Sequence, residues 1–190
     1  MKIGGLQTFT LSDYPGHCAA IIFTIGCNFC CPYCHNKSLL NEVTAQQISE
    51  EEIFTFLSKR HGKLDGVVIT GGEPTIQPGL EHFIKKIKEM NYKVKLDTNG
   101  SRPNVLQKLI EQNLVDYIAM DIKAPFSMYE KVAGTKILTA NIAKSIELIR
   151  QSKIGYMFRT TWDKSLLTEN DMSSIEALFS DYKLVIQDCT

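Results

Sequence analysis

Short, nearly continuous apolar segments alternate with amphipathic helical patterns along almost the whole chain. The apolar segments span residues 19–25, 66–70, 93–98, 115–122, 155–161 and 183–187. Runs of this length without a polar face are typical of strands that are buried on both sides of a parallel sheet. The alternation therefore predicts an α/β fold in which a helix after each strand crosses back over the sheet.

Helix signals stand between these segments. Ser49 and Glu52 form a capping-box pattern ahead of an apolar stripe, and Gly62 is a stop signal beyond it. Proline at the start of a helix and Ser, Thr or Asn at its N-cap are both favourable. The five expected helices begin at or near Ser49, Pro78, Pro103, Thr139 or Asn141, and Thr168.

The number of strands limits the architecture. A closed barrel of eight βα units typically needs about 250 residues, and this chain has 190 residues with 44% hydrophobic content, which suits one domain over residues 1–190. We expect a partial (β/α)6 TIM-like barrel of parallel strands with outer helices. A flat doubly wound sheet is the alternative, and in both folds the site lies where the strands end.

The charge balance favours no polyanionic partner. Lys and Arg together number 21, and so do Asp and Glu. No apolar run has the length of a membrane span, and residues 1–16 lack the apolar stretch of a secretory signal. We therefore expect a cytoplasmic protein without a nucleic-acid or membrane partner. Its six cysteines are then expected to serve metal or redox chemistry rather than disulfides.

The segment GCNFCCPYCHN, residues 26–36, directly follows the first expected strand. Its residues Cys27, Cys31 and Cys34 form a C-x3-C-x2-C pattern, and three thiolates on such a loop suit three corners of an iron–sulfur cube. A zinc site that also uses Cys30 is the alternative. It is disfavoured because zinc ribbons separate their C-x2-C pairs so that the pairs can converge.

The segment GGEP follows the second expected strand. Gly71 and Gly72 allow the backbone to approach a ligand closely, and Glu73 with the flanking carbonyls can meet an ammonium group. A plain turn is the alternative, since Gly-Gly and Pro are common loop residues.

Charged residues also stand at the ends of, or inside, later strands. Asp97 and Asp121 each end an apolar strand, and Lys123 follows the second of them. A buried acidic group is costly unless it is paired, so these residues are expected to form a charge network or to meet a ligand. Arg159, inside the strand YMFRTT, is expected either to bind substrate or to neutralise the aspartates.

The cysteine loop, with aromatic Tyr33 before its last cysteine, and the GGEP segment together resemble the radical S-adenosylmethionine superfamily. The resemblance implies that Cys27, Cys31 and Cys34 hold a [4Fe–4S] cluster whose open iron binds the amino and carboxylate groups of S-adenosylmethionine. An electron from the cluster then breaks a carbon–sulfur bond and releases a 5′-deoxyadenosyl radical. Cys30 lies outside the family pattern and is expected to be a spectator.

The segments LSDYPG, CPYCHN, DTNG, DIKAP and FRTT occur in an order that resembles the activating enzymes of glycyl radical enzymes, most closely those of anaerobic ribonucleoside-triphosphate reductase. The resemblance implies that the large subunit of that reductase is the substrate and that a flavodoxin- or ferredoxin-type protein is the reductant. The implied cofactor-binding residues are Tyr33, Gly71, Gly72, Glu73, Pro74, Asp97, Thr98, Asp121 and Lys123.

Particular roles follow from the same resemblance. In that branch the lysine that matches Lys123 contacts the carboxylate of S-adenosylmethionine. The residues that match Asp97, Thr98 and Asp121 lie beside it, sometimes around a monovalent cation. The implied catalytic and substrate-contacting residues are Asp13, His35 and Arg159. For Asp13 and His35 the alternatives are a turn-forming role and a plain loop position.

Other functions remain open at this point. A small-molecule enzyme such as 7-carboxy-7-deazaguanine synthase shares the fold, as does an activator of another glycyl radical enzyme. An iron–sulfur electron carrier would leave GGEP, DTNG and DIK without a purpose. The chain has no insertion of paired cysteine motifs, which excludes the multi-cluster activators, and its ending IQDCT predicts a short C-terminal cover over the barrel.

Overall fold

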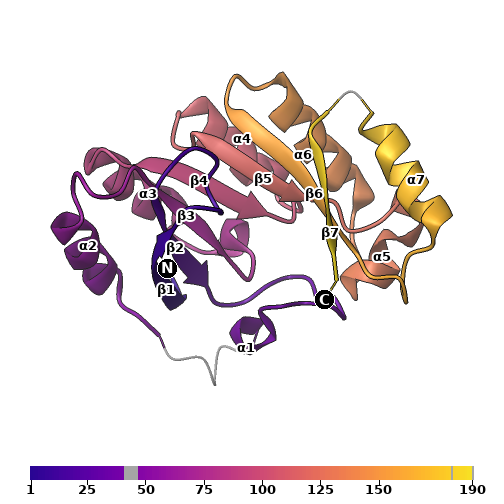
Figure 1. The fold of residues 1–190 in the computed structure, drawn as a ribbon, viewed down its shortest axis with the longest axis horizontal. Coiled ribbons are helices and arrows are strands. Elements are labelled where there is room, and N and C mark those ends of the chain that lie inside the picture. Colours follow the sequence, from indigo (N-terminus) through magenta and orange to yellow (C-terminus); the bar gives the residue numbers. More distant parts are fainter. Residues whose placement is uncertain (41–46, 181, 190) are drawn as a thin grey trace.

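A seven-stranded sheet runs through the computed structural model, which describes residues 1–40, 47–180 and 182–189 (Figure 1). Its strands are β1 (Ile3–Thr10), β2 (Ala19–Thr24), β3 (Gly66–Gly71), β4 (Lys93–Thr98), β5 (Tyr117–Asp121), β6 (Gly155–Trp162) and β7 (Leu184–Asp188). They pair in sequence order, β1 antiparallel to β2 and every later pair parallel. All six expected strands are confirmed, with only their ends shifted.

Strand β1 was not expected, so the count of six strands is corrected to seven within the described residues. Its sequence, IGGLQTFT, contains Gly4 and Gly5, and its residues 7–9 are exposed. Glycine and polar residues give little strand signal, because strand propensity mostly reflects packing on neighbours. At the edge of the sheet β1 gains its conformation from pairing with β2.

The longest helices are α2 (Glu50–Lys59), α3 (Leu80–Glu89), α4 (Pro103–Glu111), α6 (Thr139–Gln151) and α7 (Glu169–Leu178). Shorter ones are α1 (Lys37–Leu40), η1 (Pro74–Ile76), η2 (Phe126–Met128) and α5 (Tyr129–Ala133). Two expected caps are confirmed, since Ser49 begins α2 and Thr168 begins α7, each through a complete capping box. Helix α6 begins at Thr139 as expected, but its N-cap is Leu138 and has no side-chain hydrogen bond. Among the described residues no helix is both long and apolar enough to span a membrane.

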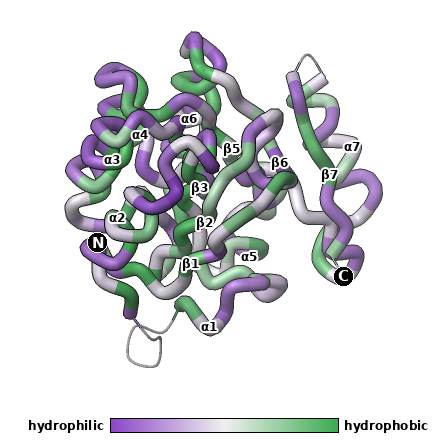
Figure 2. Tube along the Cα trace, turned by 60° about the vertical axis from the view of Figure 1, so that its left-hand side comes forward, coloured by the Kyte–Doolittle hydropathy of each residue, from purple (hydrophilic) through white to green (hydrophobic). Residues whose placement is uncertain are grey.

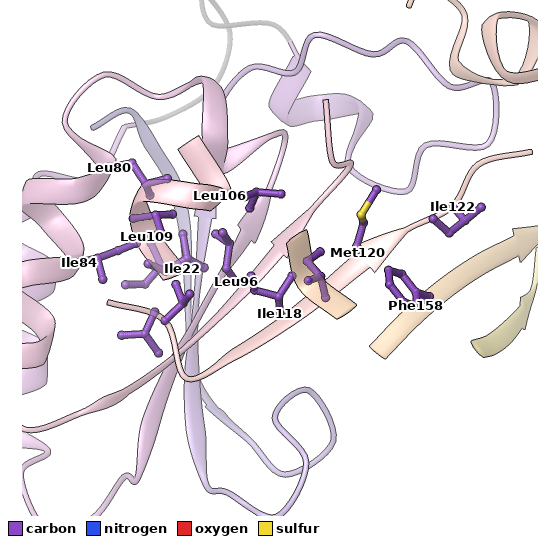
Figure 3. Packing of buried hydrophobic residues seen from close by; sticks show 14 of the residues in the cluster. Ile22, Leu80, Ile84, Leu96, Leu106, Leu109, Ile118, Met120, Ile122 and Phe158 are labelled. Carbon is purple, nitrogen blue, oxygen red and sulfur yellow. The ribbon is translucent and has the colours of Figure 1, made fainter. Parts of the chain in front are cut away.

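The helices and one face of the sheet share a single hydrophobic core. Alternate residues of each strand point to this face because side chains alternate along a strand. Figure 3 shows strand residues facing helix residues, and the hydropathy colouring of Figure 2 is apolar along β2 and alternates along α3 and α4. The labelled core residues are Ile22, Leu96, Ile118, Met120, Ile122 and Phe158, with Leu80, Ile84, Leu106 and Leu109 from helices. Burying each contributes about 1.5–3 kcal/mol.

The strand order decides between the two expected architectures. A doubly wound sheet reverses its order and carries helices on both faces, whereas here the order rises steadily and α2 to α7 contribute to one core. The sheet turns progressively from β2 to β7 (Figure 1), which makes its other face an interior. The α/β fold with parallel strands and outer helices is confirmed, and β1 and β7 form two unjoined edges of an open barrel.

The interior face is apolar at one end and charged at the other. Tyr14, Ala19, Ile21 and Val68 form a small separate cluster near the N-terminal ends of the strands. Closer to the C-terminal ends of the strands, the side chains of β4, β5 and β6 that point to this interior face are charged: they are Lys, Asp and Arg. The sheet therefore places its charges beside the loops that follow the strands.

Candidate active site

A cavity of about 390 Å³ opens in the barrel interior and against the loops that follow β2 and β3. Small-molecule sites typically measure roughly 300–1,000 Å³. The expected site residues that line it are Asp13, Cys27, Cys31, Tyr33, Cys34, His35, Gly71, Gly72, Glu73, Asp97, Thr98, Asp121, Lys123 and Arg159. Pro74 is absent from this lining, because it is the buried first residue of η1. The tertiary structure thus brings nearly all of them together.

The cysteine loop forms a tight turn directly after the C-terminal end of β2. The amide of Cys34 donates to the carbonyl of Cys31 at 3.1 Å, and the amide of Phe29 donates to Sγ of Cys27 at 3.3 Å. Cys30 is exposed, and it does not line the cavity. The three pattern cysteines therefore face the cavity while Cys30 does not, and their role as cluster ligands stays a prediction.

The donor set fits an iron–sulfur cluster. Burial raises the pKa of the Cys27 thiol to about 12, and burial also raises that of Cys31, so thiolates here need a strongly cationic partner. Among the described residues no three His, Cys, Asp or Glu side chains converge on one point, as a single-ion zinc site would require. In a cubane each cysteine binds a different iron, so such convergence is not needed. The side chain of Asn99 lies 3.9 Å from Sγ of Cys27 as an added donor.

The glycine loop packs directly on the entry to the cysteine loop. The amide of Gly72 donates to the carbonyl of Thr24, and the amide of Glu73 donates to the carbonyl of Gly26, both at 2.9 Å. A Cβ atom on Gly72 would lie 1.9 Å from the carbonyl oxygen of Gly26. Glycine is needed here because two segments of the protein's own backbone approach each other closely. This reason adds to the one expected from the sequence, which was the close approach of a ligand.

The side chain of Glu73 links the glycine loop to the C-terminal end of β4 through hydrogen bonds. Its Oε1 accepts hydrogen bonds from the amide of Thr75 at 3.0 Å and the hydroxyl of Thr98 at 2.8 Å, and its Oε2 accepts from the amide of Asn99 at 2.7 Å. Burial raises the pKa of this carboxyl. Both carboxylate oxygens of Glu73 already accept hydrogen bonds from the protein. The expected contact with an ammonium group therefore stays a prediction, and the carbonyl groups of the glycine loop are the acceptors left for it.

Five charged side chains form one continuous chain across the interior. Lys95 pairs with Oδ1 of Asp97, and Nη1 of Arg159 lies 3.1 Å from Oδ2 of Asp97. Nε of Arg159 lies 2.8 Å from Oδ1 of Asp121, and Nζ of Lys123 lies 3.1 Å from Oδ2 of Asp121. The expected charge network is present. Lys95 was missed, although its position two residues before Asp97 puts both on the same strand face.

The charge chain keeps Asp121 ionised. Burial by itself would raise the pKa of Asp121, but Lys123 and Arg159 outweigh it and lower the pKa to about 2. For Lys123, burial by itself would lower the pKa, but the nearby Asp121 carboxylate outweighs burial and raises the pKa. Three cations and two anions make up the chain, so it carries one uncompensated positive charge. An anionic group beside Lys123 would balance the charge of this chain, while the carboxyl groups of Asp13 and Glu73 line the same cavity outside the chain.

Tyr33 offers a second feature that suits a ligand. Its hydroxyl is buried and has no hydrogen-bond partner within the described part of the chain. Nζ of Lys123 lies 5.9 Å from the centre of its ring. A buried polar group without a partner is costly, and a bound ligand beside Lys123 would satisfy it.

Asp13 and His35 lie at different places on the cavity wall. The Asp13 carboxylate accepts hydrogen bonds from the hydroxyls of Thr10 and Ser12, which is the turn-forming role expected as an alternative. Thr10 pairs with Ala19, so Asp13 lies beyond the opposite end of β2 from the cysteine loop. His35 is exposed beside the last pattern cysteine. The two residues share the cavity without adjoining each other.

Comparison with known proteins gives relatives along the whole chain. The family model of the Radical SAM superfamily matches residues 21–166. MJ1227 of Methanocaldococcus jannaschii, named provisionally as a glycyl-radical enzyme activating enzyme, is 33% identical over 96% of this chain and 77% of its own length. The pyruvate formate-lyase-activating enzyme of Clostridium pasteurianum is 28% identical over 64% of this chain and 52% of its length. The 7-carboxy-7-deazaguanine synthase of Koribacter versatilis is 28% identical over 86% and 70%.

Solved structures of low sequence identity share the fold. The structure of anSMEcpe with bound AdoMet matches with a TM-score of 0.67 at 18% identity, over 87% of this chain and 49% of that one. QueE from Escherichia coli matches with a TM-score of 0.53 at 16% identity, over 98% and 93%. The chain thus spans about half of anSMEcpe and roughly half to three quarters of the sequence relatives named above. Because the family model matches residues 21–166, which is more than half of the chain and includes most of the segments that line the cavity, the chain belongs to the radical S-adenosylmethionine superfamily.

Proposed function

We propose that this protein activates a glycyl radical enzyme, and that its substrate is the large subunit of anaerobic ribonucleoside-triphosphate reductase. One observation carries the proposal: the pattern cysteines, the glycine loop and every member of the charge chain except Lys95 line a single cavity. The match to MJ1227 over 96% of the chain supports the activating branch. A flavodoxin- or ferredoxin-type protein is the proposed reductant.

The cysteine loop is proposed to hold the cluster through Cys27, Cys31 and Cys34. When bound, the [4Fe–4S] cluster supplies the electron that breaks a carbon–sulfur bond of S-adenosylmethionine. The protein's part is to orient this cofactor and to keep water away from it. Phe29 lines the cavity beside the cysteines, and burial of its side chain excludes solvent from that wall.

The charge chain is proposed to hold the carboxylate of S-adenosylmethionine at Lys123. The chain's single excess positive charge is the physical reason, because an anion at Lys123 balances it. The unpartnered hydroxyl of Tyr33 lies on the same wall and is proposed as a further contact.

Replacing Lys123 with methionine tests this contact. A charge-assisted hydrogen bond contributes roughly 1.5–3 kcal/mol, so S-adenosylmethionine affinity should fall about 10- to 150-fold. Equilibrium binding to the reconstituted protein measures it. Lys88→Met, which removes an ion pair with Asp116, is the matched control. Unchanged affinity together with a lower unfolding temperature would assign Lys123 a purely structural role.

The substrate is proposed to enter between the two unjoined sheet edges. Gln7 on β1 and Gln187 on β7 both line the cavity, so it reaches both edges. A radical formed inside must reach a backbone glycine of another protein, and this opening admits a flexible loop. Asp13, His35 and Arg159 lie on the wall that such a loop would follow.

Electron paramagnetic resonance tests the substrate. The reduced protein, given S-adenosylmethionine and the anaerobic reductase large subunit, should produce a doublet glycyl radical signal. Deuterium on the substrate glycine should appear in 5′-deoxyadenosine. Cleavage of S-adenosylmethionine without this signal for any glycyl radical protein supplied would reject the activating role while keeping the cofactor chemistry.

A 7-carboxy-7-deazaguanine synthase activity is the second candidate. The Koribacter versatilis synthase matches 86% of this chain and supports this candidate. Turnover of that enzyme's small-molecule substrate, with no radical on any protein, would select this candidate.

A further inference from the structure

The resemblance to activating enzymes implied a monovalent cation between the two aspartates of the interior. In the structure each of the four carboxylate oxygens already has a cationic partner from the chain. Asp97 is held by Lys95 on Oδ1 and by Arg159 on Oδ2. Asp121 is held by Arg159 on Oδ1 and by Lys123 on Oδ2. The guanidinium of Arg159 therefore bridges the position where a cation would join the pair.

The threonine expected beside that cation is also engaged elsewhere. The hydroxyl of Thr98 donates to Oε1 of Glu73 at 2.8 Å and accepts from the amide of Gly100 at 3.1 Å. The amide of Gly100 thus takes one of the two lone pairs of this oxygen, which leaves at most one for a cation.

Charge and burial point the same way. The exposed fractions of the five side chains run from 2% for Lys95 to 29% for Asp121, so the chain is shielded from much of the solvent. It already carries one excess positive charge, and an added cation would raise this to two in a partly buried place. Unbalanced buried charge is costly. The residues present thus do not fit the implied cation.

We propose that Arg159, assisted by Lys95, replaces the monovalent cation, so that cofactor binding and cleavage in this protein are independent of K⁺ and Na⁺. The activity part rests on the proposed use of S-adenosylmethionine. Arg159 then acts as a positioning residue: it sets the spacing of Asp97 and Asp121, and through Asp121 it places Lys123.

The first test uses the cluster-loaded protein in KCl, NaCl or tetramethylammonium chloride at equal ionic strength. Formation of 5′-deoxyadenosine should agree within about twofold among the three salts, and the unfolding temperature should agree within about 1 °C, since a ligand that does not bind gives no stabilisation. Specific activation or stabilisation by K⁺ or Na⁺ would overturn the proposal. Absence of cleavage in all three salts would instead reject the proposed function, and the unfolding temperatures would still decide the cation question.

The second test removes the guanidinium. Arg159→Met leaves two ion pairs with a gap between the aspartates, and K⁺ or Na⁺ should then fill the gap. At a cation concentration about fivefold above its dissociation constant, the unfolding temperature should rise by roughly 2–4 °C over that in tetramethylammonium. Arg150→Met removes an exposed arginine that pairs with Glu147 on α6, and this variant should gain no cation response.

A folding failure of Arg159→Met is covered by Arg159→Lys. One ammonium cannot reproduce two separate contacts to Asp97 and Asp121, so this variant should gain a smaller cation response. An Arg159 variant that folds and shows no response to either cation would overturn the replacement.

Discussion

Single replacement of Cys27, Cys31 or Cys34 by alanine is expected to abolish cluster binding. The reconstituted parent should contain about four iron and four sulfide per chain. Each of these thiols faces the cavity from a tightly turned loop, and no other described cysteine lines that cavity to substitute for a lost ligand. Iron and sulfide analysis, together with the visible absorption of the cluster, measures the loss. Cleavage of S-adenosylmethionine should disappear with it.

Cys30→Ala is the matched control for this series. Cys30 lies within the same eleven-residue segment, yet it is exposed and outside the cavity. Its variant should keep the cluster and most of the cleavage activity. Loss of iron from Cys30→Ala, or tight zinc binding without charge-transfer absorption in the parent, would contradict the assignment of three iron ligands.

Gly72→Ala is expected to have the second large effect. The new Cβ would lie 1.9 Å from the carbonyl oxygen of Gly26 and 2.6 Å from its carbonyl carbon, and neither backbone atom can swing aside like a side chain. The glycine loop and the cysteine loop must then separate, which also strains the bond from Gly72 to Thr24. We expect a loss of about 1–3 kcal/mol in the free energy of unfolding and loss of S-adenosylmethionine binding. Chemical denaturation and equilibrium binding measure the two effects.

Gly5→Ala supplies the comparison. A Cβ there would meet the ring of Phe23 at 3.4 Å, which is ordinary contact, and Gly5 has no positive φ that would favour glycine. The change in the free energy of unfolding should stay within about 0.5 kcal/mol. If Gly72→Ala lost no more stability and no more S-adenosylmethionine binding than Gly5→Ala, the close contact between the glycine loop and the cysteine loop would be contradicted.

The two glycines of GGEP show where sequence reasoning stopped. Their freedom was read from the sequence as room for a ligand, because glycine admits close approach. The structure adds that the approaching group is the backbone of Thr24 and Gly26. A contact between segments about 45 residues apart leaves no mark in local sequence, and only the pairing of β2 with β3 creates it.

Local patterns were sufficient for the parallel strands, the helix caps and the cysteine loop, because each depends on residues close together in the chain. Apolar runs mark buried strands, Ser49 and Thr168 mark helix starts, and the spacing of three cysteines marks the loop. Strand β1 was not predicted, because an exposed, glycine-containing edge strand is stabilised by pairing with its neighbour rather than by its own residues.

The order of the interior charges was decided by tertiary structure alone. Sequence identified Asp97, Asp121, Lys123 and Arg159 as charges that need partners, but it left open whether Arg159 serves a substrate or the aspartates. The parallel register places Asp121 opposite Arg159 and leaves Asp97 on the neighbouring strand within reach of the same guanidinium. These partners are 38 and 62 residues apart. Their pairing follows from the strand register, which is set by burial of the apolar side chains on the other face of the sheet and not by the charged side chains that it aligns.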